Sequence, residues 1–183
     1  MRYMTKVLVD TNILIYSVDE LEGEKHLKAA ETVQRLMESG EMIISSQNLA
    51  ELSRVLLEKA NPPQKHDDVT KYLFRFHKLG RVVDYNSETV IRAVMLSKEY
   101  KIHFFDALLV ATMQENNVSE ILTENIGDFK KISWLKARNP FKKWDVMSSK
   151  KKKKPKEIEE KLKFKTDDPK LSEKIDEIVY DQE

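Results

Sequence analysis

The chain has 183 residues, of which 34% are charged and 40% hydrophobic, and its formal net charge is +1. This length suits one domain with an appendage, and the balanced charge provides no overall basic footprint for nucleic acid. The sequence has no Cys, which excludes disulfides, thiolate catalysis and Cys-ligated zinc. No apolar run approaches the roughly 18 residues of a membrane span, so we expect a cytoplasmic protein without a membrane partner.

Short apolar runs alternate with longer helical patterns from residue 6 to about residue 135. Strands are predicted at 6–10, 41–45, 81–84 and 119–123. Helices are predicted at 13–18, 24–39, 65–78, 87–100 and 105–116. A further helix ends at residue 60, and its N-terminal cap can be Ser45, Ser46 or Asn48. This alternation predicts an α/β fold with three layers, α/β/α, around a mainly parallel central sheet.

The composition changes near residue 147. We predict one domain over residues 1–147, followed by a charged linker and an amphipathic C-terminal segment over 148–183. Residues 150–154 are five consecutive Lys, which suits either contact with RNA or a solvated tail. Leu171, Ile175, Ile178 and Val179 then recur at helical spacing within an acidic stretch, and such a stripe needs a surface to lie against.

Four acids are predicted near one edge of the sheet. Asp10 closes the first strand and Asp128 lies in the loop after the fourth, and parallel sheets bind ligands beyond the carboxyl ends of their strands. Glu51 lies in the first turns of the helix after the second strand, where stabilisation of the helix dipole is the alternative explanation. Asp106 lies on an apolar stripe near the start of its helix, where a capping role is the alternative.

Four converging acids would repel one another unless a divalent cation compensated them. Mg²⁺ and Mn²⁺ prefer oxygen ligands, and such an ion activates water and stabilises displacement at phosphorus. The sequence contains no G-x-x-x-x-G-K-[ST], G-x-G-x-x-G or G-x-S-x-G motif, so the usual nucleotide cradles and the serine nucleophile elbow are absent.

Four segments of the chain resemble PIN-domain ribonucleases, in particular the VapC-type toxins of toxin–antitoxin pairs. They are V-L-V-D-T-N-I-L-I-Y at 7–16, S-S-Q-N-L-A-E-L at 45–52, F-F-D-A-L-L-V-A-T at 104–112 and I-L-T-E-N-I-G-D-F at 121–129. The resemblance implies a metal-dependent endoribonuclease that uses Mg²⁺ or Mn²⁺ to hydrolyse RNA. It also implies an antitoxin protein as partner and a homodimer.

The resemblance also implies the site residues. Asp10, Glu51 and Asp106 match the three most regular acids of the family and are expected to be catalytic metal ligands. Asp128 is the favoured fourth acid, with Asn125 as a secondary neighbour. Supporting polar roles are expected for Thr11, Asn12 and Thr123.

Two other functions stay open at this point. A phosphatase or phosphotransferase could use Asp10 as nucleophile, but that chemistry usually places a second acid two residues later, where this chain has Asn12. A non-catalytic PIN-like scaffold that binds RNA or protein would instead depend on the lysine run and the acidic C-terminal segment.

Overall fold

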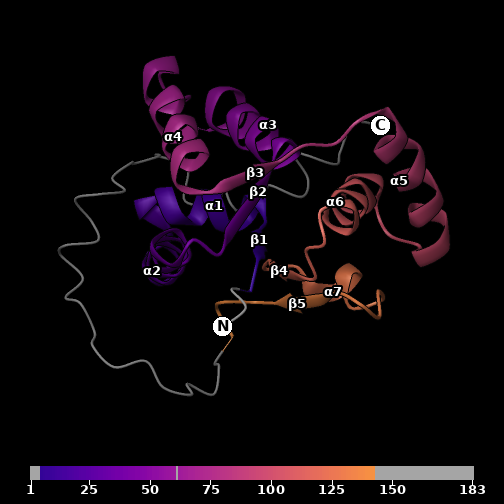
Figure 1. Ribbon diagram of the computed structural model, residues 1–183. Coiled ribbons are helices and arrows are strands. Elements are labelled where there is room, and N and C mark those ends of the chain that lie inside the picture. The colour runs from indigo at the N-terminus through magenta and orange to yellow at the C-terminus, as the bar shows by residue number, and fades with distance from the viewer. Residues whose placement is uncertain (1–4, 61, 143–183) are drawn as a thin grey trace.

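The computed structural model describes residues 5–60 and 62–142. Its central sheet has five parallel strands in the order β3-β2-β1-β4-β5 (Figure 1). The strands are β1 (Val7–Val9), β2 (Met42–Ser45), β3 (Arg81–Val83), β4 (Glu120–Leu122) and β5 (Lys136–Arg138).

Helices connect these strands. They are α1 (Thr11–Val18), α2 (Glu24–Ser39), α3 (Ser46–Arg54), α4 (His66–Leu79), α5 (Ser87–Tyr100), α6 (Phe104–Glu115) and α7 (Ile126–Phe129). A 3₁₀ turn at Glu20–Glu22 precedes α2, and a π-helical turn at Val55–Lys59 extends α3. Within the described residues, none of the helices has the length and apolarity to span a bilayer.

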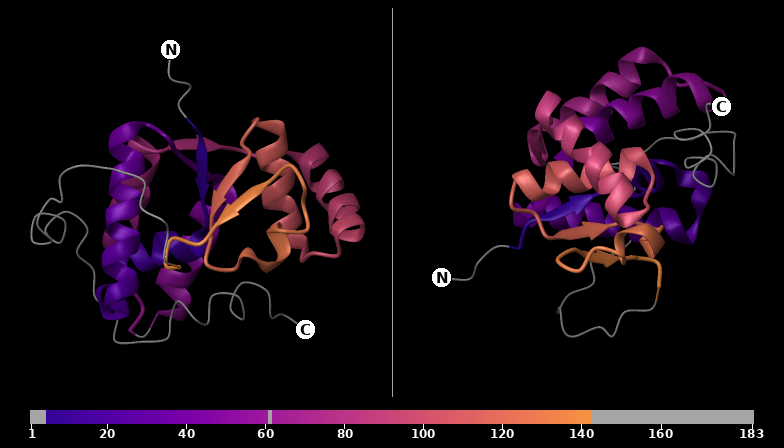
Figure 2. Two further views of the ribbon diagram at one scale, coloured as in Figure 1. Left: turned by 90° about the horizontal axis from the view of Figure 1, so that it is seen from below. Right: turned by 90° about the vertical axis from the view of Figure 1, so that its right-hand side faces the viewer.

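Alternating strand residues divide the core into two clusters. Val7 and Val9 of β1 pack with α1–α4, whereas Leu8 between them packs with α5 and α6 on the opposite face. This is the period of two expected for a strand buried on both faces. The left view of Figure 2 shows the strands between these two helical layers, so the predicted three-layer α/β/α fold is confirmed.

The element boundaries differ from the prediction at two places near the C-terminal end of the domain. Four strands are predicted, but the structure also has β5, because K-A-R at the sheet edge carries no apolar run to signal a strand. The predicted loop after β4 contains the single-turn helix α7. The predicted domain boundary at 147 and the tail 148–183 lie outside the described residues.

Candidate active site

Asp10 follows β1 directly, at the carboxyl edge of the sheet. Its backbone N–H donates to the carbonyl of Leu122 at 2.9 Å, which continues the β1–β4 pairing by one residue. Since Val9 pairs with Leu122, this register brings Asp10 beside Thr123, the residue that follows β4. Asp10 also caps α1, because its Oδ1 accepts a hydrogen bond from the backbone N–H of Thr11 at 2.7 Å.

The hydroxyl of Thr123 is oriented toward Asp10. Its Oγ1 accepts from Asn12 Nδ2 at 3.4 Å and from the backbone N–H of Asn125 at 3.1 Å. With these donors around it, the hydroxyl hydrogen is directed to Asp10 Oδ2 at 2.7 Å. Thr123 is fully buried, whereas Asp10 is partly exposed, so water can reach this hydrogen bond only from the side of Asp10.

Glu51 comes to the same edge on α3. Ser45 caps this helix through a capping box with Asn48, which selects Ser45 among the three predicted caps. One turn later the carboxylate of Glu51 accepts from Thr11 Oγ1 at 2.5 Å and from Gln47 Nε2 at 2.8 Å. The side chain of Glu51 therefore faces the start of α1, rather than acting only on the dipole of its own helix.

The hydroxyl of Thr11 is oriented in the same manner as that of Thr123. Its Oγ1 accepts from Asn48 Nδ2 at 3.0 Å and donates to Glu51. Two buried threonines thus each present a hydroxyl hydrogen to one carboxylate. Both carboxylates are thus oriented as hydrogen-bond acceptors.

Asp106 lies in the first turn of α6, where its side chain is partly buried. The N-cap of α6 is His103, so the alternative in which Asp106 caps its own helix is wrong. Gln47 Nε2 donates to the carbonyl of Phe105 at 3.0 Å as well as to Glu51. This amide therefore ties the beginning of α6 to α3.

The electrostatics of Asp10 reflect this grouping. Burial is the largest cause that raises the pKa of its carboxyl, and the charges of Glu51 and Asp106 raise it further. Hydrogen bonds from Thr123 and Thr11 act in the opposite direction, and the resulting pKa is about 7. Three of the four predicted acids are thus close enough to act on one another electrostatically.

The fourth predicted acid has a different environment. Asp128 lies in α7 and forms an ion pair with Lys131 at 2.6 Å, and Lys131 also donates to the carbonyl of Lys101. Asn125 caps α7 through its side chain and contacts Thr123 through its backbone N–H. The charges that raise the pKa of Asp10 come from Glu51 and Asp106, so Asp128 is not shown to be part of that group.

A second polar cluster, which sequence reasoning missed, adjoins the site at Glu124. Its carboxylate accepts from the Tyr16 hydroxyl and pairs with Lys25 Nζ at 2.9 Å, and Lys25 also donates to Tyr16 at 3.1 Å. The backbone N–H of Glu124 donates to Asn12, and its carbonyl accepts from Asn139. These contacts fix the chain immediately after Thr123.

Burial alone would lower the pKa of Lys25, but its hydrogen bonds to Glu124 and Tyr16 raise that pKa above its usual range. These hydrogen bonds therefore favour the charged form of Lys25.

We expect Lys25→Met to lower the free energy of unfolding by about 1 kcal/mol, since the Lys25 side chain is one-third exposed and its charge is partly screened. Urea unfolding at pH 7 measures this loss. Lys28→Met on the exposed face of the same helix is the control, and an equal loss in both variants would contradict the role of the cluster.

Oxygen atoms dominate the donors at this edge, which fits Mg²⁺ or Mn²⁺ rather than zinc. Within residues 5–60 and 62–142, no three His, Cys, Asp or Glu side chains already form a group arranged to hold a metal ion. The mutual repulsion that raises the pKa of Asp10 is nonetheless what a divalent cation would relieve. The donor chemistry fits the ion, and Glu51 would have to share its carboxylate between the ion and its present partners.

Gln47 and Asn48 are further polar residues of the site that the sequence prediction did not assign to it. Both are buried, and each contacts a residue of the predicted set. The sequence carries little signal for them, because Asn48 already has a role as a helix cap and nothing in S-S-Q-N shows that Gln47 is buried.

Comparisons with known proteins agree with this fold. The family model described as "PIN domain" matches residues 7–135. A search of curated proteins found no match.

Solved structures with the same fold were found at low sequence identity. A chain of the VapBC2 structure from Rickettsia felis, bound to a promoter DNA fragment, is 22% identical with a TM-score of 0.57. The match covers 77% of this chain and all of that one. The structure of Mycobacterium tuberculosis VapC20, described as a sarcin–ricin loop cleaving toxin, is 17% identical with a TM-score of 0.52, covering 68% of this chain and 94% of that one.

Proposed function

Because the chain belongs to the PIN domain family, we propose that it is a divalent-metal-dependent endoribonuclease that hydrolyses RNA phosphodiester bonds. The observation that carries the proposal is the grouping of Asp10, Glu51 and Asp106 at the carboxyl edge of the sheet, where Asp10 has a pKa of about 7. Burial is the largest cause of this raised pKa, and the charges of Glu51 and Asp106 add to it, so negative charge is concentrated around a buried carboxyl. A group of acids that repel one another lowers the stability of the fold, so a catalytic role is the better reason for its presence.

In this proposal Asp10, Glu51 and Asp106 would hold Mg²⁺ or Mn²⁺, with Asp128 as the fourth acid. When bound, the ion supplies an activated water and neutralises charge on the phosphoryl oxygens. Thr123 and Thr11 orient the carboxylates of Asp10 and Glu51 through their hydroxyl groups. Asn12, Asn48 and Asn125 in turn occupy the acceptor positions of these hydroxyls.

A biological role as the toxin of a toxin–antitoxin pair is part of the same proposal. It is supported by the family and by the VapBC complexes with this fold, including the DNA-bound complex from Salmonella typhimurium, which is 20% identical with a TM-score of 0.56 and covers 75% of this chain and 99% of that one. Residues 1–147 would be the catalytic domain. The expected partners are an antitoxin protein and a second copy of the chain.

The function is tested by incubating the purified chain with single-stranded and structured RNAs in Mn²⁺, in Mg²⁺ and in EDTA. Cleavage is expected with either metal and is expected to fall to background in EDTA, then to return when Mn²⁺ is added in excess. RNA that is bound but remains intact in Mn²⁺ would instead support the non-catalytic scaffold. Cleavage that persists in EDTA would overturn metal dependence.

The fourth acid is tested separately. We expect Asp128→Asn to slow cleavage by about tenfold, and less in high Mn²⁺, because its charge is not among those that raise the pKa of Asp10 and it already pairs with Lys131. Lys131→Met is the matched control, since it removes the same ion pair but keeps the carboxylate. If Asp128→Asn and Lys25→Met have full activity and Glu124→Gln does not, then Glu124 is the fourth acid, because Lys25→Met breaks the same ion pair but keeps the carboxylate.

A further inference from the structure

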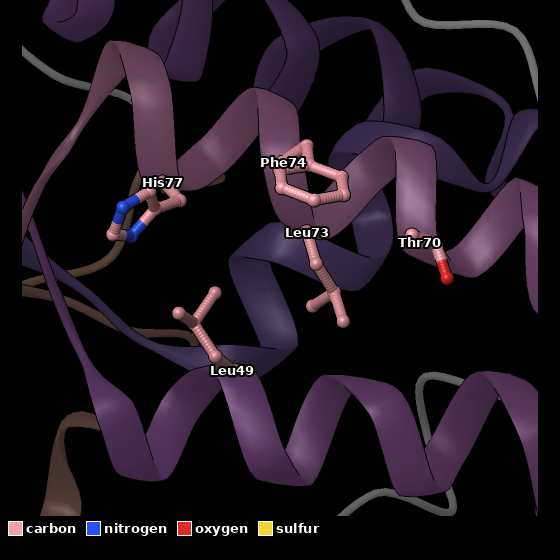
Figure 3. Close-up of a pocket in the computed structure, with 5 residues that line it drawn as sticks. All are labelled: Leu49, Thr70, Leu73, Phe74 and His77. Atoms are coloured by element: carbon pink, nitrogen blue, oxygen red, sulfur yellow. The ribbon is translucent and has the colours of Figure 1, made fainter.

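An apolar groove lies between α3 and α4, on the helical layer that carries Glu51. It has a volume of about 410 Å³ and is lined almost entirely by apolar surface, from Leu49, Thr70, Leu73, Phe74 and His77. Figure 3 shows Leu49 on α3 and Leu73 on α4 extending into the space between the two helices. The groove is thus distinct from the carboxylate site, although Leu49 is only two residues from Glu51.

The four α4 residues of the groove follow the helical repeat i, i+3, i+4 and i+7. Such a stripe is the pattern of a helix face that packs against another element. Phe74 at its centre is nevertheless 70% exposed, the highest exposure among the large apolar side chains of the described residues. An apolar groove of this size with an exposed aromatic residue is typical of a docking surface.

The same chain contains a segment with the complementary pattern. Leu171, Ile175, Ile178 and Val179 are spaced i, i+4, i+7 and i+8, so a helix formed by them would present one apolar stripe. These residues lie outside the described part of the chain. The domain thus exposes an apolar helix face, and its own C-terminal sequence contains an apolar stripe that needs such a face.

The charges of the two surfaces are complementary. Residues 171–180 contain three acids and one Lys, and Asp181 and Glu183 follow them. The last turn of α4, at one end of the groove, contains His77 and Lys78, both at exposed positions. Exposed charges of opposite sign favour encounter and fix the orientation of a docked helix more than they add affinity.

The connecting chain is long enough to reach the groove. Residues 143–170 supply 28 residues between the described domain and the stripe. As a flexible linker they would have a root-mean-square span of about 30 Å, compared with a radius of gyration of about 14 Å for a domain of this size. Tethering of this kind gives an effective concentration on the order of millimolar, so even a weak contact is populated.

We propose that residues 171–180 dock as an amphipathic helix in the α3–α4 groove of their own chain. The apolar stripe covers Phe74 and Leu73, and the acidic side chains lie near the basic last turn of α4. A second copy of the chain or a separate protein could present similar chemistry. The intrachain occupant is favoured because tethering gives it the higher effective concentration.

The experiment measures the distance between the segment and α4 in the full chain. The sequence has no Cys, so Asp67→Cys and Gln182→Cys introduce the only two sites for spin labels. Asp67 is exposed in the first turn of α4 and does not line the groove. Double electron–electron resonance is expected to show one narrow distance distribution, unchanged when labelled protein is diluted with unlabelled protein.

Two disrupting variants and one control accompany this measurement. Phe74→Asp, and separately Ile175→Asp with Ile178→Asp, are expected to broaden the distribution at least about twofold, toward that of a free linker. Ile91→Asp is the control, because Ile91 is an apolar residue of similar exposure (60%) on α5. A distribution that is broad from the outset, one that neither variant changes, or one that disappears on dilution would overturn intrachain docking; the last outcome would assign the groove to a second copy.

Discussion

Asp10→Asn is expected to reduce RNA cleavage at least about a hundredfold in saturating Mn²⁺, because it removes the carboxylate on which the charges of both Glu51 and Asp106 act. Asn is nearly isosteric but has one acceptor oxygen where Asp10 has two. It can keep the hydrogen bond from the Thr11 backbone N–H, and with it the cap of α1, but it loses the one from the Thr123 hydroxyl. The loss of activity should still arise mainly from the missing charge, because a single hydrogen bond contributes only about 0.5 to 1.5 kcal/mol. Initial cleavage rates on one labelled RNA measure it.

Asp84→Asn provides the matched control for this prediction. Asp84 also follows a strand of the same sheet, β3, but it is exposed at the sheet edge. We expect this variant to cleave RNA at the wild-type rate. Calorimetric titration adds a readout that does not depend on cleavage, in which Asp10→Asn should weaken Mn²⁺ binding at least about tenfold and Asp84→Asn should not. Wild-type cleavage by Asp10→Asn would make the proposed mechanism wrong.

Asp10→Asn is also expected to change the free energy of unfolding differently at pH 5 and at pH 8. In EDTA, the substitution should be more stabilising at pH 8 than at pH 5, by about 1 to 3 kcal/mol. The pKa of the Asp10 carboxyl rises from its ordinary value of 3.8 to about 7 in the folded protein. Between about pH 4 and pH 7 the folded state therefore keeps a proton that the unfolded state has released, so the stability of the wild type falls as the pH rises through this range. The full shift would correspond to roughly 4 kcal/mol, and we expect less because the carboxylate is partly exposed.

The comparison of pH 5 with pH 8 isolates the charge. At pH 5 the wild-type Asp10 is protonated and resembles Asn, whereas at pH 8 it is ionised beside Glu51 and Asp106. Any loss of hydrogen-bond geometry in the variant is present at both pH values and cancels in the difference. Urea unfolding at the two pH values measures the effect, and Mn²⁺ should stabilise the wild type at pH 8 more than the variant. Stability curves that run parallel with pH would contradict the raised pKa.

The sequence by itself predicted the layers of the fold. In β1, Val7, Leu8 and Val9 are apolar without alternation, which signals a strand covered on both faces, and the helical repeats between the strands supplied the covering layers. It also placed Asp10 at a strand end, since that follows from local order along the chain. The edge strand β5 escaped prediction because K-A-R is polar and its pairing with β4 is made by backbone groups that any residue carries.

Only the tertiary structure decided which polar residues meet. The β1–β4 register brings Asp10 to Thr123, 113 residues away, and the packing of α3 against α1 brings Glu51 to Thr11, 40 residues away. Asp128 and Glu124 both follow β4. Asp128 pairs with Lys131 because α7 brings these two residues together, and Glu124 pairs with Lys25 because α2 lies beside the end of β4. Sequence patterns show which face of an element is apolar, but they do not give distances between elements. The layers of the fold could therefore be predicted from the sequence, whereas the contacts between the site residues required the tertiary structure.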